Sequence, residues 1–223
     1  MGTVDLWREM RKSVDLLMRY PQIILAAFPS AFLVSVANFL VWDRRFSRIT
    51  LFFQWGTSIL LVLCGFFLAL LTLGFITFLF WDFEVRGEIR FRRSLRMFSR
   101  RFYEIFFAAL IVGFLVGFFS FWFFLPGLVF GFLLMFTIPA VVVEGDDPFG
   151  AIRRSFHLVI ENLGECFTFT VLALFLLVIG YLLFWIFGFA SLVGIAINTI
   201  LGGAILAYLS VLLSRFYLGL SRF

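Results

Sequence analysis

Four long intervals of the sequence contain no Asp, Glu, Lys, Arg or His, and they limit what the chain can fold into. They cover residues 20–42, 49–81, 105–143 and 166–214. A helix needs about 20 residues to cross roughly 30 Å of hydrocarbon. A charge at the centre of such a helix costs about 2.5–3.5 kcal/mol. The four intervals therefore predict one, one, two and two membrane spans.

The two longer intervals each need an internal turn. Residues 125–127 read LPG, and a proline cannot continue a helix without losing a backbone hydrogen bond. Residues 188–191 are the candidate turn in the last interval, and Pro139 is expected to kink the fourth span or end it early. The six expected spans cover residues 21–42, 55–80, 104–124, 128–143, 166–187 and 192–214.

The composition supports a membrane protein and excludes several other classes. Hydrophobic residues make up 63% of the chain and charged residues only 14%, whereas an average soluble domain is about 25% charged. This balance excludes a cytosolic enzyme, a secreted disulfide scaffold and a disordered tail. The first apolar interval is longer than a signal-peptide core, so we expect it to remain in the mature protein. The expected fold is an all-α membrane protein with a single integral membrane domain, 1–223.

The positions of the basic residues predict the orientation. With six spans, 15 of the 18 basic residues fall on one side of the membrane, and only Arg44, Arg45 and Arg48 lie on the other. The positive-inside rule places the basic side in the cytoplasm. We therefore expect a protein of the cytoplasmic (inner) cell membrane with both termini inside.

A basic pair followed by serine occurs three times on the basic side, at residues 11–13, 92–94 and 153–155. The later two copies also align at Glu104 with Glu165 and at Phe106 with Phe167. This spacing predicts three repeat units, about 3–81, 90–143 and 149–218. In each unit, an amphipathic interfacial helix would precede a hairpin of two spans.

Helical periodicity supports these three interfacial helices. Each segment places large apolar side chains on one face and charges on the other. Tyr20–Pro21 is expected to end the first helix, and Asp147 and Pro148 to start the third as N-cap and first-turn residue. The expected apolar faces are Trp7, Met10, Val14 and Leu17 in the first helix, Phe91, Leu95, Phe98 and Phe102 in the second, and Phe149, Ile152, Phe156, Val159 and Leu163 in the third.

The second of these helices is unusual because residues 90–101 contain six Arg and no acidic residue. Segment 144–165 has the opposite balance, with five acidic residues against two Arg, a net charge of −3. Two interpretations stay open: the arginines bind anionic lipid headgroups, or they pair with the acidic segment or another partner. The candidate binding residues are Arg92, Arg93, Arg96, Arg100 and Arg101.

Patterns typical of catalysis are absent from the sequence. No nucleotide-binding glycine loop, metalloprotease motif or Gly-x-Ser-x-Gly occurs, and a single His with two separated Cys predicts no metal site and no cofactor. The basic helix needs its aromatic face for the membrane, so nucleic acid is not an expected partner. Asn198 with Thr199, just before Gly202–Gly203, is the place where a substrate site would lie if the protein were a permease.

One resemblance covers nearly the whole chain. Segment 138–145 reads IPAVVVEG and segment 147–159 reads DPFGAIRRSFHLV, followed by Asn162. These residues, with 11–21 and 83–94, resemble the membrane domain of glycerophosphodiester phosphodiesterases and related uncharacterised multi-pass families of bacteria and archaea. The resemblance implies a six-span domain without an assigned activity. The phosphodiesterase catalytic domain found in some members has no counterpart in 1–223, so no catalytic residue carries over.

Together these patterns predict a non-catalytic, multi-pass membrane protein that acts as a scaffold, an accessory subunit or a lipid-interface module. Its expected partners are membrane lipids, anionic ones among them, with other membrane subunits or a cytoplasmic protein. Two alternatives stay open: a small-molecule or lipid permease, and the membrane half of an enzyme whose catalytic chain is separate.

Overall fold

The computed structural model describes residues 6–42, 48–187 and 192–221, and the elements in these ranges are ten α-helices without a strand. The helices are α1 Leu6–Arg19, α2 Gln22–Trp42, α3 Arg48–Arg86, α4 Phe91–Arg100, α5 Phe102–Trp122, α6 Phe124–Leu133, α7 Thr137–Val143, α8 Pro148–Glu161, α9 Leu163–Phe187 and α10 Leu192–Ser221.

Five segments of the described residues are helical, long and apolar enough to cross a membrane. A further pair of helices, Trp7–Arg19 and Gln22–Ala37, is bent by 94° and raises the number to six if the pair counts as one span. The prediction of an all-helical chain with several helices long and apolar enough to span a membrane is therefore confirmed for the described residues. The five segments are Leu60–Arg86, Phe102–Ser120, Leu125–Val143, Leu163–Leu183 and Val193–Ser221.

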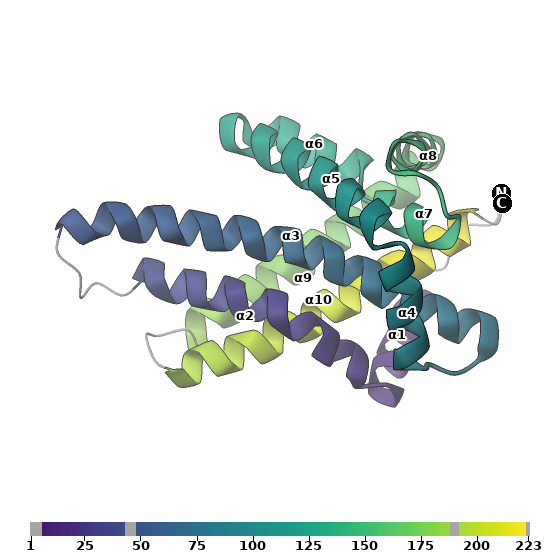
Figure 1. Ribbon diagram of the computed structural model, residues 1–223, viewed down its shortest axis with the longest axis horizontal. Coiled ribbons are helices and arrows are strands. Elements are labelled where there is room, and N and C mark those ends of the chain that lie inside the picture. Colours follow the sequence, from purple (N-terminus) through teal and green to yellow (C-terminus); the bar gives the residue numbers. More distant parts are fainter. Residues whose placement is uncertain (1–5, 43–47, 188–191, 222–223) are drawn as a thin grey trace.

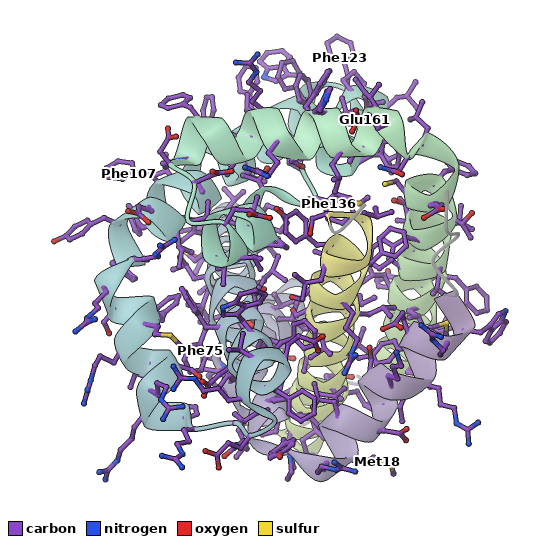
Figure 2. The ribbon with its side chains drawn as sticks, turned by 90° about the vertical axis from the view of Figure 1, so that its right-hand side faces the viewer. Met18, Phe75, Phe107, Phe123, Phe136 and Glu161 are labelled. Carbon is purple, nitrogen blue, oxygen red and sulfur yellow. The ribbon has the colours of Figure 1, made fainter. Side chains whose placement is uncertain are left out.

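The long helices run along the molecule, and three shorter ones, α1, α4 and α8, cross them at one end (Figure 1). Seen from that end, α8 lies across the top, α4 down the left and α1 at the lower right, around the end of α10 (Figure 2). We call this the arginine-rich end, because α4 and its preceding residue carry Arg90, Arg92, Arg93, Arg96 and Arg100. Within the bundle, α2 packs against both α3 and α10, and α5 packs against α6.

The best-packed core lies at the arginine-rich end. The last three turns of α10 are buried almost completely, with Phe216 and Tyr217 against Phe136 of the segment between α6 and α7. Phe80 near the end of α3 and Ile105 in the first turn of α5 belong to the same cluster. Far less of α9 is buried, as expected of a helix whose outer face contacts lipid.

Glycine allows α2 to lie close to both of its neighbours. A Cβ at Gly65 of α3 would lie 2.8 Å from Cγ2 of Val34, and one at Gly203 of α10 would lie 2.8 Å from Cδ1 of Phe28. Small residues at such positions let helices approach closely in a membrane, where packing and hydrogen bonds replace the hydrophobic effect as the driving force.

The predicted turn at residues 125–127 is wrong by a few residues. The chain reverses at Phe123, whose φ of −147° and ψ of 108° are extended, and α6 already begins at Phe124. Pro126 thus occupies the first turn of α6, where no intrahelical donor is needed. Gly127 allows the return helix to contact α5, because a Cβ there would lie 2.6 Å from the Ser120 Cα.

The expected break near Pro139 occurs one turn earlier. The chain leaves helical geometry between Leu133 and Thr137, and Pro139 lies in the first turn of α7. A proline ring clashes with the carbonyl four residues before it, here that of Met135, so the disruption falls before the proline. The fourth span is consequently made of two helices, α6 and α7, and begins earlier than predicted.

Other predicted boundaries agree with the structure. Tyr20–Pro21 separates α1 from α2, and α8 has Asp147 as its N-cap and begins at Pro148. The helices α3 and α10 extend beyond the predicted spans, past Asp82 and Arg215 respectively. The predicted turn at 188–191 lies outside the described residues.

Candidate functional site

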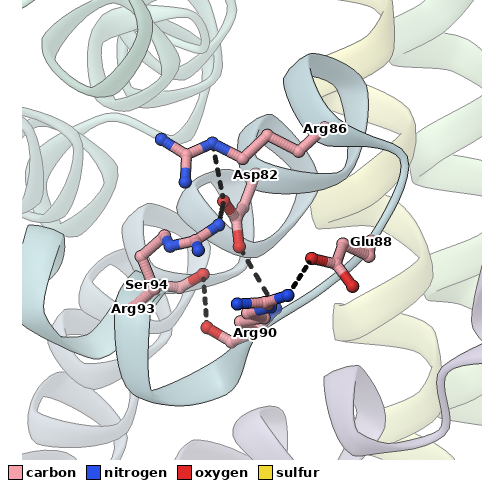
Figure 3. Close-up of polar contacts among 6 residues, drawn as sticks. All are labelled: Asp82, Arg86, Glu88, Arg90, Arg93 and Ser94. Atoms are coloured by element: carbon pink, nitrogen blue, oxygen red, sulfur yellow. Dashed lines mark hydrogen bonds and ion pairs between the residues drawn. The ribbon is translucent and has the colours of Figure 1, made fainter.

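Asp82 connects the end of α3 to the start of α4. Only 2% of its surface is exposed, although it directly follows an apolar span. Its carboxylate accepts a hydrogen bond from the backbone N–H of Arg90 at 3.1 Å and one from the guanidinium of Arg93 at 3.3 Å (Figure 3). Arg86 lies 3.9 Å away, while the more exposed Glu88 pairs with Arg90. The connecting loop and the first turn of α4 are therefore held by a single buried carboxylate.

Two of the five predicted binding arginines, Arg93 and Arg101, contact other parts of the protein. Arg93 of α4 forms an ion pair with Asp82 of the neighbouring helix α3. Arg101, between α4 and α5, donates from Nη1 to the carbonyl oxygen of Val141 at 3.1 Å, and its guanidinium lies against Gly145. Gly145 has a φ of +78°, which favours glycine. Arg101 thus lies against the start of the acidic segment, but its hydrogen bond goes to a main-chain oxygen of α7.

Two carboxylates at the start of the acidic segment, Glu144 and Asp146, have partners on α8 and α10. Arg154 binds Asp146 at 2.6 Å and lies 3.9 Å from Glu144. Glu144 also accepts a hydrogen bond from the hydroxyl of Tyr217 at 3.3 Å. The hydrogen bond to Asp146 raises the pKa of the Arg154 guanidinium. Because Glu144 and Asp146 are already paired, they are poor partners for the arginines of α4.

The other three predicted binding residues, Arg92, Arg96 and Arg100, form a row on α4. Each is exposed, and none has an ion pair or hydrogen bond to the side chains that the structure describes. Residues four apart in an α-helix lie within about 40° of each other around its axis. The row therefore presents three guanidinium groups on one face.

An apolar row lies next to this arginine row. Phe91 and Leu95 of α4 are partly exposed, although Phe91 also contacts Phe75 of α3 edge to face. Phe102, also partly exposed, begins α5 beyond the break at Arg101. The centres of the two rows are separated by about 120° around the axis, at 100° per residue. The buried side of the helix, which includes Ser94, faces the bundle. The predicted apolar face is therefore only partly used for packing.

The helices α1 and α8 share with α4 a buried serine and exposed apolar side chains. Ser13, Ser94 and Ser155 are all 0% exposed. The residue that follows each serine is apolar and exposed, and so are further large side chains on α1 and α8. These exposed residues are Trp7, Val14 and Met18 on α1, Leu95 on α4, and Phe149, Phe156 and Ile160 on α8.

The buried serine of α8 has a clear structural role. Its hydroxyl donates to the carbonyl oxygen of Leu133 at 2.8 Å and accepts from the N–H of Phe136 at 3.1 Å. It therefore satisfies backbone groups freed by the break between α6 and α7, where unpaired groups would be costly. Ser13 instead donates to the carbonyl oxygen of Glu9 in its own helix.

Of the two predicted substrate residues, Asn198 lines a cavity and Thr199 does not. Asn198 lines a cavity of about 370 Å³ between α2, α3, α9 and α10. Only 7% of Asn198 is exposed, and its Oδ1 atom has no hydrogen-bond partner among the described residues. Thr199 is outside the lining of this cavity, and its hydroxyl donates to the carbonyl oxygen of Ile195 at 2.8 Å.

Two charged residues in this arrangement were missed by reasoning from the sequence. Asp82 and Arg215 each directly follow an uncharged interval. The sequence therefore indicated only that they lie at the end of a membrane span. The Arg215 side chain is only 10% exposed, lies 3.6 Å from Glu9 of α1, and stacks over the Phe80 ring of α3 at 5.0 Å. A charge on a helix whose neighbouring turns are apolar is the signal that could have identified both.

The chain matches no family model, no curated protein and no solved structure. The resemblance to phosphodiesterase membrane domains therefore stays a prediction. Among the residues that the structure describes, no group of three or more His, Cys, Asp or Glu side chains is placed to hold a metal ion.

Proposed function

We propose that this protein is a non-catalytic, multi-pass membrane protein that binds anionic lipid headgroups through α4. In this proposal, six spans form three hairpins in the cytoplasmic membrane, and both termini lie inside. The helices α1, α4 and α8 lie at the inner surface of the bilayer. The exposed apolar side chains of these helices enter the acyl boundary, and the arginines of α4 contact the headgroups.

The observation that carries this proposal is the exposed row of Arg92, Arg96 and Arg100, which has no ion pair with the side chains described, beside the exposed apolar Phe91 and Leu95. An interfacial helix needs both surfaces, since one inserts and the other meets the charged layer. Each basic residue near an anionic surface contributes about 1 kcal/mol, so three contribute about 3 kcal/mol. That corresponds to roughly a 100-fold preference for anionic over neutral lipid at 1.4 kcal/mol per tenfold.

The alternative partner for the row, the acidic segment, is less suited to it. Glu144 and Asp146 already interact with Arg154 and Tyr217. Moving α4 to reach them would also break the contact between Arg93 and the buried Asp82. Anionic lipid needs no such rearrangement, because the row is already exposed.

The test compares two triple variants in detergent by native mass spectrometry, with phosphatidylglycerol and phosphatidylcholine as probes. Replacement of Arg92, Arg96 and Arg100 by Gln should reduce the preference for phosphatidylglycerol by roughly 100-fold at low salt. The control replaces Arg44, Arg45 and Arg48, which the positive-inside rule places on the other side of the membrane, by Gln.

The control removes the same charge without removing the row, so it should retain most of the preference. An unchanged preference in the α4 variant would refute the proposal. An equal loss in both variants would also refute it, because net charge and not the row would then determine binding.

A further inference from the structure

The cavity beside Asn198 lies at a depth where hydrocarbon surrounds the protein. On α10 its lining runs from Asn198 to Leu209, and on α3 from Val62 to Ala69. At 1.5 Å per residue, Asn198 is about 25 Å from the level of Arg215, and Val62, the lining residue of α3 farthest from the arginine-rich end, is about 30 Å from the level of Asp82. A hydrocarbon core about 30 Å thick that begins near these charges would contain the whole cavity.

The wall of the cavity is almost entirely apolar. Leucine, isoleucine, valine, phenylalanine, alanine and glycine side chains form most of it, and no Asp, Glu, Lys, Arg or His occurs among the described residues that line it. A phosphate or another charged headgroup would find no counter-charge there, and burial of an unpaired charge at this depth is costly. The occupant must therefore be uncharged.

Asn198 differs from the two serine side chains in the same wall. Ser30 and Ser35 donate to the carbonyl oxygens of Ala27 and Ala31 at 2.9 and 2.8 Å, so their protons are satisfied within α2. The Oδ1 atom of Asn198 is buried and accepts no hydrogen bond from the described residues. An unsatisfied acceptor is costly in hydrocarbon, and a donor on a bound molecule would satisfy it.

We propose that this cavity binds a single-chain neutral lipid whose hydroxyl group donates a hydrogen bond to Asn198. The size suits one chain, because a volume of about 370 Å³ lies near the lower end of the range of about 300–1,000 Å³ found for small-molecule pockets. The surrounding bilayer supplies such molecules directly, so the ligand needs no aqueous path.

The experiment uses the full-length protein in nanodiscs and a photoreactive diazirine derivative of 1-tetradecanol as the probe. After irradiation, labelled peptides are mapped by mass spectrometry. We expect labelling at the cavity walls on α3, α9 and α10. Unlabelled 1-tetradecanol should compete, and its methyl ether, which has no donor, should compete at least tenfold less well.

Variants test the role of Asn198 separately from the cavity. Asn198→Leu should make the alcohol and the ether equally effective competitors. Thr199→Val is the matched control, because Thr199 is adjacent but outside the lining, and it should keep the tenfold difference. Ala69→Phe should abolish labelling by filling the space from α3.

Three results would overturn this proposal. The first is labelling spread over lipid-facing surfaces without enrichment at the cavity walls, which would mean partition into the bilayer only. The second is equal competition by alcohol and ether in the unaltered protein, and the third is a tenfold difference that survives in Asn198→Leu. None of these results depends on Arg92, Arg96 or Arg100, so they leave the anionic-lipid proposal unaffected.

Discussion

Replacement of Asp82 by Ala should destabilise the arginine-rich end more than any change at an exposed charge nearby. The substitution removes a charged acceptor from the Arg90 N–H, and such hydrogen bonds contribute about 1.5–3 kcal/mol. It also leaves the Arg93 guanidinium, which is 29% exposed, without its partner. Removing one partner of a buried pair costs about 3–5 kcal/mol, and partial exposure of Arg93 moves the total toward the lower end, about 3–4 kcal/mol.

Thermal unfolding in a mild detergent, followed by tryptophan fluorescence, measures this effect. At about 2–4 °C per kcal/mol for a chain of this size, the midpoint should fall by roughly 6–16 °C. Asp82→Asn keeps an oxygen acceptor for the Arg90 N–H and should lose about half as much. Hydrogen exchange should increase in residues 86–101 before the rest of the bundle opens.

Glu88→Gln provides the matched control, because it removes one negative charge from the same loop. Glu88 and Arg90 are both largely exposed, and such pairs contribute under about 1 kcal/mol. Equal midpoints for Asp82→Ala and Glu88→Gln would show that the buried carboxylate does not hold α4, and the reasoning from its contacts would be wrong.

Two further predictions concern the backbone. Ser155→Ala should cost about 1–3 kcal/mol and speed hydrogen exchange at residues 134–137, because two buried backbone groups lose their partner; exposed Ser99→Ala should change neither. Gly145→Ala and Gly87→Ala each place a side chain at positive φ, at about 1–2 kcal/mol. Only Gly145→Ala also displaces Arg101, so its thermal unfolding midpoint should be lower than that of Gly87→Ala. Equal midpoints would show that the displacement of Arg101 costs no stability.

The helical architecture was predictable because burial of charge in a bilayer is costly. Uncharged intervals therefore coincide with spans, and Pro21 and Pro148 correctly indicated where helices end and begin. The same residue type misled at Pro126 and Pro139. A proline is tolerated in the first turn of a helix as readily as it ends one. Local sequence does not distinguish the two cases.

The arginine row was predictable only as part of a larger set. Sequence composition identified five arginines together, but whether each is free depends on contacts with distant segments. Arg93 meets Asp82 eleven residues earlier, and Arg101 meets the main chain of Val141 forty residues later. Asn198 was selected because it is polar within an apolar interval. The cavity beside it is lined by α2, α3, α9 and α10, which are far apart in sequence, so no local pattern predicts it.

The contact between Glu9 and Arg215 has a consequence for biosynthesis. Asp82 and its arginines are close in sequence, so that contact can form soon after residue 93 has been synthesised. The core around Phe216 and Tyr217 needs α1 at one end of the chain and α10 at the other. Contacts of such high sequence separation form late. Leu16 and Leu17 of α1 must therefore stay partly uncovered until residues 216 and 217 have been synthesised.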